Sequence, residues 1–317
     1  MTNKYYHYGI TRCKEICIKQ VSALFKEDGV CAPIRRFYYE DNVTIQVEQS
    51  GGCRTTTIIS DSPMRALYLW GVFHYLDLFF MLCEGQFIEI NEVSFISGEE
   101  ATEPLKRFSE ICVDERPNFY HSADFCKYQI NCWLNPISLM SQELFDNWID
   151  LLDKLDIIHN VVLYNVSNVG ITIDVKAMFL IESFEGLTDL LKDEITFRKA
   201  KYRESQLNIY LIAIINEHGK VIFKKEIAYG IEKVTKVFVD SRNRIAHIHT
   251  KPDRKFFNGD ESLVYTVKLF YLYRVVLFHL LSIDTSMFEQ EIKEAVETWD
   301  NHQGIIESFL DSFIGCN

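Results

Sequence analysis

The chain has 317 residues, of which 48% are hydrophobic, 14% aromatic and 25% charged, so it holds enough apolar material for two cores of ordinary domain size. This composition excludes a disordered chain and a collagen-like one. The net charge of −12, from 33 Lys and Arg against 45 Asp and Glu, argues against nucleic-acid binding over the whole surface and leaves room only for a local basic patch.

Cysteine usage and hydropathy indicate a soluble cytoplasmic protein. Nine scattered cysteines, an odd number, do not form a disulfide framework, and we expect reduced thiols. Residues 1–19 carry charges throughout, so no secretory signal is expected. The apolar stretches 66–83 and 263–283 approach membrane length, but each holds ionisable groups that cost about 2.5–3.5 kcal/mol apiece at a bilayer centre. We interpret both as core helices, with no membrane contact.

Alternating apolar and polar residues predict β-strands in the first half of the chain. Val43, Ile45 and Val47 alternate with polar residues, and a turn at 50–52 leads to a second strand at 55–59, which together predict a hairpin. Further strands are predicted at 88–90, 93–96, 128–134 and 161–164.

One helix interrupts these strands. Its apolar residues recur every three or four positions behind Ser141, the expected N-cap, and they are Phe145, Trp148, Leu152 and Leu155.

After residue 170 the apolar residues recur at helical spacing to the end of the chain. One stripe predicts a long first helix and consists of Ile173, Ala177, Leu180, Phe184, Leu187, Leu191 and Ile195. The next helices are expected at 207–214 (ending at Gly219), 223–238, 263–281 and about 287–313. The helix at 263–281 is apolar nearly all round, which suits a bundle centre or a dimer interface. We therefore expect an α+β protein with a β-rich domain at 1–168 and a helical bundle at 169–317.

The helical half contains the clear basic segment of the chain. Residues 190–260 carry 15 Lys or Arg against 9 Asp or Glu, a net charge of +6 in a chain whose total is −12. Within it stands the run Ser241-Arg242-Asn243-Arg244-Ile245-Ala246-His247-Ile248-His249. An imidazole that moves protons near neutral pH and a guanidinium that holds a phosphate are the groups that metal-free RNA cleavage needs.

Spacing alone does not select this run, because an Arg followed five residues later by a His also occurs elsewhere. The pairs are Arg116 with His121, Arg244 with His249 and Arg274 with His279. Pro117 blocks a helix at the first pair. The last pair lies in the apolar helix, where we interpret Arg274 as a snorkelling side chain and His279 as a core histidine.

The run Arg242 to His247 resembles the RNxxxH form of the R-x4-6-H motif of HEPN domains, which are small helical bundles. The order of elements over about residues 170 to 285 is similar to that of the ApeA-like branch of this family. This order is a long helix, two more helices, the motif, a polar loop and an apolar helix, and the long helix contains the run Phe179-Leu180-Ile181-Glu182-Ser183-Phe184-Glu185-Gly186-Leu187. The resemblance implies a metal-independent endoribonuclease of phage defence, abortive infection or toxin systems, active as a homodimer through the helical domain and without a cofactor.

The resemblance also implies roles for single residues. His247 would transfer protons, Arg242 would contact the scissile phosphate of a tRNA or single-stranded RNA, and Asn243 would orient them. Arg244 and His249 are not fixed by the motif and are either auxiliary RNA contacts or solvated side chains. The first half looks similar to sensor domains that meet a trigger or an antitoxin protein.

Helix geometry points to a dimer as well. At about 100° per residue, positions five apart diverge by roughly 140° on a straight helix. Either the helix breaks between Arg242 and His247, or a symmetry mate supplies the second group.

Two alternatives remain. Cys13, Cys17 and Cys31, or His121, Cys126 and Cys132, lack the spacing of a zinc site, so no metal is expected. A non-catalytic HEPN sensor or binding module, acting through dimerisation or partner contact, is the second functional hypothesis, since polar residues after a helix are often only capping residues.

Overall fold

The computed structural model describes residues 16–26, 32–50, 52–85, 90–96, 103–114, 133–167, 171–247 and 254–313. The chain divides into two compact units: residues 1–118 with 134–149, and residues 119–133 with 150–317. The second unit therefore begins before the boundary expected at 168. The physical reason is that the helix at 157–167 packs on the long helix that follows it.

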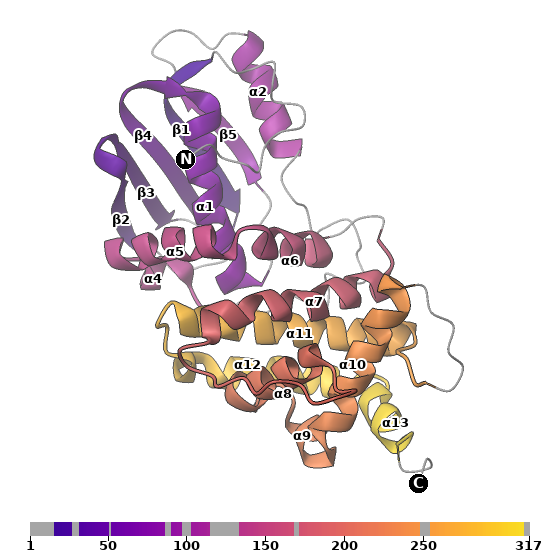
Figure 1. Cartoon of the computed structure of the whole chain (residues 1–317). Helices are drawn as coiled ribbons and strands as arrows, with labels where there is room; N and C mark the ends of the chain where they lie inside the picture. Colours follow the sequence, from indigo (N-terminus) through magenta and orange to yellow (C-terminus); the bar gives the residue numbers. More distant parts are fainter. Residues whose placement is uncertain are drawn as a thin grey trace. The chain divides into compact units, whose positions relative to one another are not determined.

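The first unit is built on a five-stranded antiparallel sheet in the order β2-β3-β4-β1-β5 (Figure 1). The strands are β1 (Cys17–Lys26), β2 (Ala32–Tyr39), β3 (Val43–Ser50), β4 (Cys53–Arg65) and β5 (Ile90–Ile96), with a short 3-10 helix, η2 (Glu40–Asn42), between β2 and β3. The predicted hairpin is confirmed, because β3 pairs with β4 from Ser50–Cys53 onward. Val43, Ile45 and Val47 all face the core.

In the described part of this unit, three helices accompany the sheet and a fourth begins. Helix α1 (Ala66–Glu84) packs on β4 and β1, α2 (Glu103–Asp114) packs on β5, and α4 (Pro136–Leu139) is a single turn (Figure 1). Arg54 of β4 is fully buried, forms an ion pair with Glu84 at the end of α1, and lies between the rings of Phe25 and Phe80. Helix α5 (Gln142–Leu155) is the predicted helix, and Ser141 Oγ accepts a hydrogen bond from the Leu144 N–H at 3.1 Å.

Two of the strand predictions need correction. Residues 161–164 form part of a helix, α6 (Ile157–Ser167), because a short apolar run fits a buried helix as well as a strand. The strands expected at 88–90 and 93–96 are the single strand β5, with residues 88 and 89 outside the described part of the chain. Most of the strand expected at 128–134 also lies outside it.

The second unit is a helical bundle, which confirms the α+β class. Its further helices are α7 (Ile173–Leu191), α8 (Gln206–His218), α9 (Lys224–Tyr229), α10 (Ile231–Ala246), α11 (Gly259–Leu280), η3 (Thr285–Phe288), α12 (Glu289–Asp300) and α13 (Ile305–Asp311). Helix α11 is the buried centre: it packs on α7, α8, α12 and α13, and every residue from 264 to 278 is buried. Asn258 and Glu261 form a capping box at its start.

Two predicted helices are each divided in the structure. The helix expected at 223–238 is α9 and α10, separated at Gly230, whose φ of +127° no helix accommodates. The helix expected at 287–313 is α12 and α13, which are separated by a turn in which Gln303 and Gly304 have positive φ.

Among the described residues, α1 and α11 are long and apolar enough to cross a membrane by length and composition alone. In each, 83% of the most apolar window is buried inside the protein. This burial is that of core helices, as expected.

Candidate functional site

The motif residues lie at the C-terminal end of α10. The helix continues through Ala246, and His247 is its C-cap with φ −114° and ψ 4°, its N–H donating to the Asn243 carbonyl at 3.1 Å. Val234 and Phe238 of α10 are buried, Arg242 and Asn243 are half-buried, and His247 at the end of the helix is exposed. Ser241 is buried and its Oγ accepts the Phe257 N–H at 2.9 Å, which holds the chain after the motif against the helix.

Arg242 is held by α7. Its Nε and Nη2 both donate to the carboxylate of Glu182, Nη2 at 2.6 Å, and its Nη1 donates to Asn243 Oδ1 at 2.8 Å. The Glu182 hydrogen bonds raise the pKa of Arg242 above its ordinary value. The Arg242 side chain is about one-fifth exposed, and its guanidinium is engaged by a carboxylate.

Asn243 lies on the wall of a basic groove of about 790 Å³ between α8, α10 and the segments that flank them. Six basic side chains line the groove, namely Arg198, Arg203, Lys233, Lys236, Arg254 and Lys255. Its two acids are both paired with arginines, Glu204 with Arg198 and Asp240 with Arg254. The lining therefore carries a net positive charge in a chain that is acidic overall.

Arg244 points to a different place. It lines a smaller hollow of about 270 Å³ with residues of α7 and α11, and its guanidinium lies 4.9 Å from the centre of the Phe256 ring. Since Asn243 lines the groove and Arg244 lines this hollow, these neighbouring motif residues lie on two separate surfaces of the protein.

His247 is exposed at the end of α10, and His249 lies outside the described residues. The break that the sequence allowed between Arg242 and His247 is not observed, because residues 242–246 are helical. Positions five apart on this helix diverge by roughly 140°, so one chain does not turn both side chains toward one point.

Glu182 was not predicted as a site residue, because the segment 179–187 was interpreted only as part of a long helix. Its ion pair with Arg242 joins positions 60 residues apart. A helical pattern shows which residues of α7 are buried, but not which distant arginine a polar one meets.

The interpretation of the third Arg and His pair was wrong. Arg274 does not snorkel: it is fully buried, with its guanidinium 3.6 Å from the centre of the Trp133 ring. His279 is not a core residue either, since it is exposed and paired with Glu194. Of the cysteines and histidines weighed for zinc, all but Cys17 lie outside the described residues.

In comparisons with known proteins, no family model, curated protein or solved structure matches this chain. The fold and the site define an α+β protein with a helical bundle that carries a partly exposed Arg-Asn-x3-His motif beside a basic groove.

Proposed function

We propose that this chain is a metal-independent endoribonuclease of the HEPN type. The observation that carries the proposal is the position of Arg242, Asn243 and His247 at the surface end of α10, next to a groove rich in lysines and arginines. A phosphate has the geometry that the Arg242 fork already recognises in Glu182, and a basic groove attracts RNA while the rest of the acidic chain repels it.

The reaction is transphosphorylation. The ribose 2′-oxygen attacks the neighbouring phosphorus after losing its proton to an imidazole, and the bond from phosphorus to the 5′-oxygen breaks as that oxygen takes a proton from an imidazolium. The products are a 2′,3′-cyclic phosphate and a 5′-hydroxyl. Arg242 stabilises the charge on the phosphate, and no metal or cofactor is required.

A homodimer supplies what one chain lacks. The reaction needs both a base and an acid, and each motif contains one histidine fixed by the resemblance, His247. An isologous dimer that joins the ends of two α10 helices brings two His247 side chains and two Arg242 side chains into one cleft. The divergence of Arg242 and His247 on an unbroken helix supports this arrangement.

The biological setting follows from the resemblance. The proposed substrate is a tRNA or a single-stranded RNA, in the cytoplasm, during phage defence, abortive infection or toxin action. The N-terminal unit would receive a trigger or an antitoxin protein.

The second candidate function is a HEPN-like module that binds without cutting. The Arg242–Glu182 ion pair favours it, because a carboxylate of the same chain holds the group that would bind phosphate. In that case RNA or a protein partner would occupy the groove, and His247 would cap α10 without chemistry.

The test is cleavage of a pool of tRNA and single-stranded RNA in excess EDTA. We expect His247→Ala and Arg242→Ala to lower the rate by about 10²–10⁴-fold. His302→Ala, which removes a histidine distant in sequence from the motif, serves as the control and retains activity. Cleavage that survives both motif substitutions contradicts the proposal, and an inactive wild type that binds RNA supports the second candidate.

A further inference from the structure

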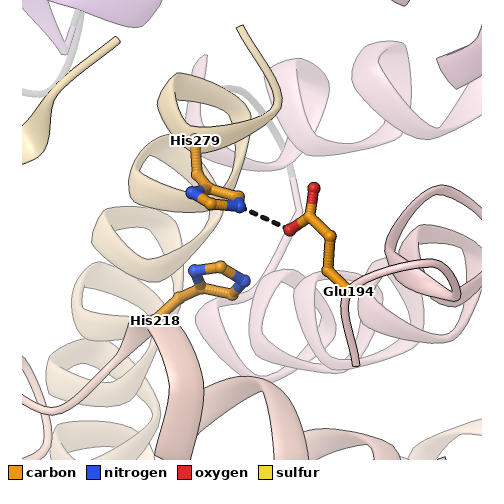
Figure 2. A group of neighbouring side chains, drawn as sticks. All are labelled: Glu194, His218 and His279. Atoms are coloured by element: carbon orange, nitrogen blue, oxygen red, sulfur yellow. Dashed lines mark hydrogen bonds and ion pairs between the residues drawn. The ribbon is translucent and has the colours of Figure 1, made fainter. Parts of the chain in front are cut away.

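The C-terminal ends of three helices in the second unit bring together Glu194, His218 and His279 (Figure 2). Glu194 lies in the turn after α7, His218 is the last residue of α8, and His279 stands in the last turn of α11. One ligand atom from each residue lies within 4.8 Å of the other two. The proposed RNA site uses none of them.

Local structure fixes the backbone beneath each side chain. The Glu194 N–H donates to the Leu191 carbonyl at 3.0 Å, and the Ser282 N–H donates to the His279 carbonyl at 2.8 Å. After His218, a Cβ on Gly219 would lie 3.1 Å from Leu272 Cδ1, so the end of α8 is pressed against α11. The three ligand atoms can therefore approach one another through side-chain rotations.

The donor atoms are suited to a metal. His279 Nε2 pairs with Glu194 Oε2, and the rings of His218 and His279 lie with their centres 4.5 Å apart. His218 Nε2 is buried and has no hydrogen-bond partner among the described residues, which is a cost that a bound ion would remove. Burial, with His279 nearby, also lowers the pKa of His218 and favours the neutral ring that binds metals.

We propose that Glu194, His218 and His279 bind one divalent transition-metal ion of the zinc class. Imidazole ligands select zinc and its neighbours over Mg²⁺ and Ca²⁺, which prefer oxygen. Two histidines and one carboxylate leave a fourth tetrahedral position for water. The partial negative charges at the three helix ends favour a cation at this place.

The geometry requires little movement. Bonds of about 2.0–2.2 Å to a tetrahedral zinc place its ligand atoms roughly 3.3–3.6 Å apart. The present separations are within 4.8 Å, and the side chains of His279 and Glu194 are 45% and 43% exposed, so both are able to rotate around an ion.

The competing interpretation is an ion pair between His279 and Glu194 that ties α11 to the turn after α7. That pair has no role for His218. His218→Ala therefore separates the two, and Glu194→Gln, an exposed and isosteric change, keeps the test decisive if His218→Ala does not fold.

The experiment titrates Zn²⁺ into the full chain after removal of metals with a chelator, using calorimetry, and repeats the titration with Co²⁺ to record its visible spectrum. We expect one ion per chain, binding weakened at least about tenfold in His218→Ala and Glu194→Gln, and unchanged binding in the control His302→Ala. The Co²⁺ spectrum should lack the near-ultraviolet band of thiolate ligands.

Absence of Zn²⁺ binding to the wild type, binding in both variants as tight as in the wild type, or a thiolate band that assigns the ion to cysteines would overturn the proposal. Loss or retention of RNA cleavage in EDTA has no bearing on it, because the metal site does not depend on the proposed ribonuclease.

Discussion

Arg242 on α10 and Glu182 on α7 form an ion pair through two hydrogen bonds. The carboxylate accepts the same paired N–H groups that a phosphate would accept, so under the proposed function Glu182 would compete with the phosphate for Arg242. The two functional hypotheses differ in the role of this ion pair. In a nuclease, RNA displaces Glu182 from Arg242; in a binding module, the ion pair is permanent and holds α7 to α10.

Replacement of Glu182 by Gln should release Arg242. The amide keeps the shape but loses the charge, and since Glu182 is 43% exposed the pair is worth only about 0.2–1 kcal/mol. We expect RNA to bind about 1.4- to fivefold more tightly, as measured by fluorescence anisotropy in EDTA on a His247→Ala background that prevents cleavage. Asp189→Asn, an exposed change of equal charge on α7, is the control. Unchanged or weaker affinity would show that Glu182 only braces the arginine.

The groove lysines should carry the electrostatic part of RNA binding. Lys233 and Lys236 are exposed on α10 and line the groove, so each is placed to meet a phosphate. Substitution of either by Ala should weaken binding and reduce the slope of log affinity against log salt by about 1 for each phosphate that is no longer neutralised. Lys293→Ala on α12, outside the groove lining, should leave the slope unchanged. Equal slopes in all variants would place RNA elsewhere.

The sheet hairpin and the long helix could be predicted because their signals are local. Alternation over 43–47 and the stripe from Ala177 to Leu191 each state which side of one element is buried, and the structure buries those residues. The wrong strand prediction arises where a contact with a residue distant in sequence determines the secondary structure. Residues 161–164 are helical in α6, which lies so close to α7 that a Cβ on Gly186 would stand 2.5 Å from Ile158 Cδ1.

The site was predictable in part for the same reason. The motif is contiguous, so the sequence shows Arg242, Asn243 and His247 directly, and helical periodicity predicts their divergence. Glu182, and the meeting of His218 with His279, depend on how whole helices pack, which no local pattern encodes. The apolar surroundings of His279 in the sequence suggested burial, yet its position at the end of α11 leaves it exposed.

A buried charge cluster should dominate the stability of the helical unit. Lys268 Nζ on α11 lies 2.7 Å from Glu226 Oε1 and 2.6 Å from Asp300 Oδ1, and all three side chains are at most 7% exposed. Lys268→Met leaves two carboxylates without a countercharge, so we expect a loss of about 3–5 kcal/mol in the free energy of unfolding, measured with urea. The exposed change Lys293→Ala should cost under about 1 kcal/mol. A similarly small loss in Lys268→Met would mean that water reaches the cluster.

The pair of Arg198 and Glu204 at the groove should make stability depend on pH. Hydrogen bonds from Arg198, and then from the Lys201 N–H, lower the pKa of Glu204 from 4.5 to about 2. Because the folded pKa is the lower one, the stabilisation is present above about pH 4.5 and disappears as the pH falls toward 2. The difference in unfolding free energy between the wild type and Glu204→Gln should therefore shrink as the pH falls from about 4.5 toward 2. A difference that stays constant over this range would exclude this linkage.

The junction of α9 and α10 depends on the backbone freedom of Gly230. Its φ of +127° is strained for any residue with a Cβ, while no atom lies within 4 Å of where that Cβ would stand. Gly230→Ala should therefore cost about 1–3 kcal/mol through backbone strain alone. Gly259→Ala is the matched control, because its Cβ would also meet nothing within 4 Å but its place in the first turn of α11 requires no positive φ. That change should be neutral or stabilise by up to about 1 kcal/mol. Urea unfolding of the two variants measures both changes in the free energy of unfolding. Equal changes would mean that α9 and α10 can join without a residue at positive φ, and that Gly230 does not determine where α10 begins.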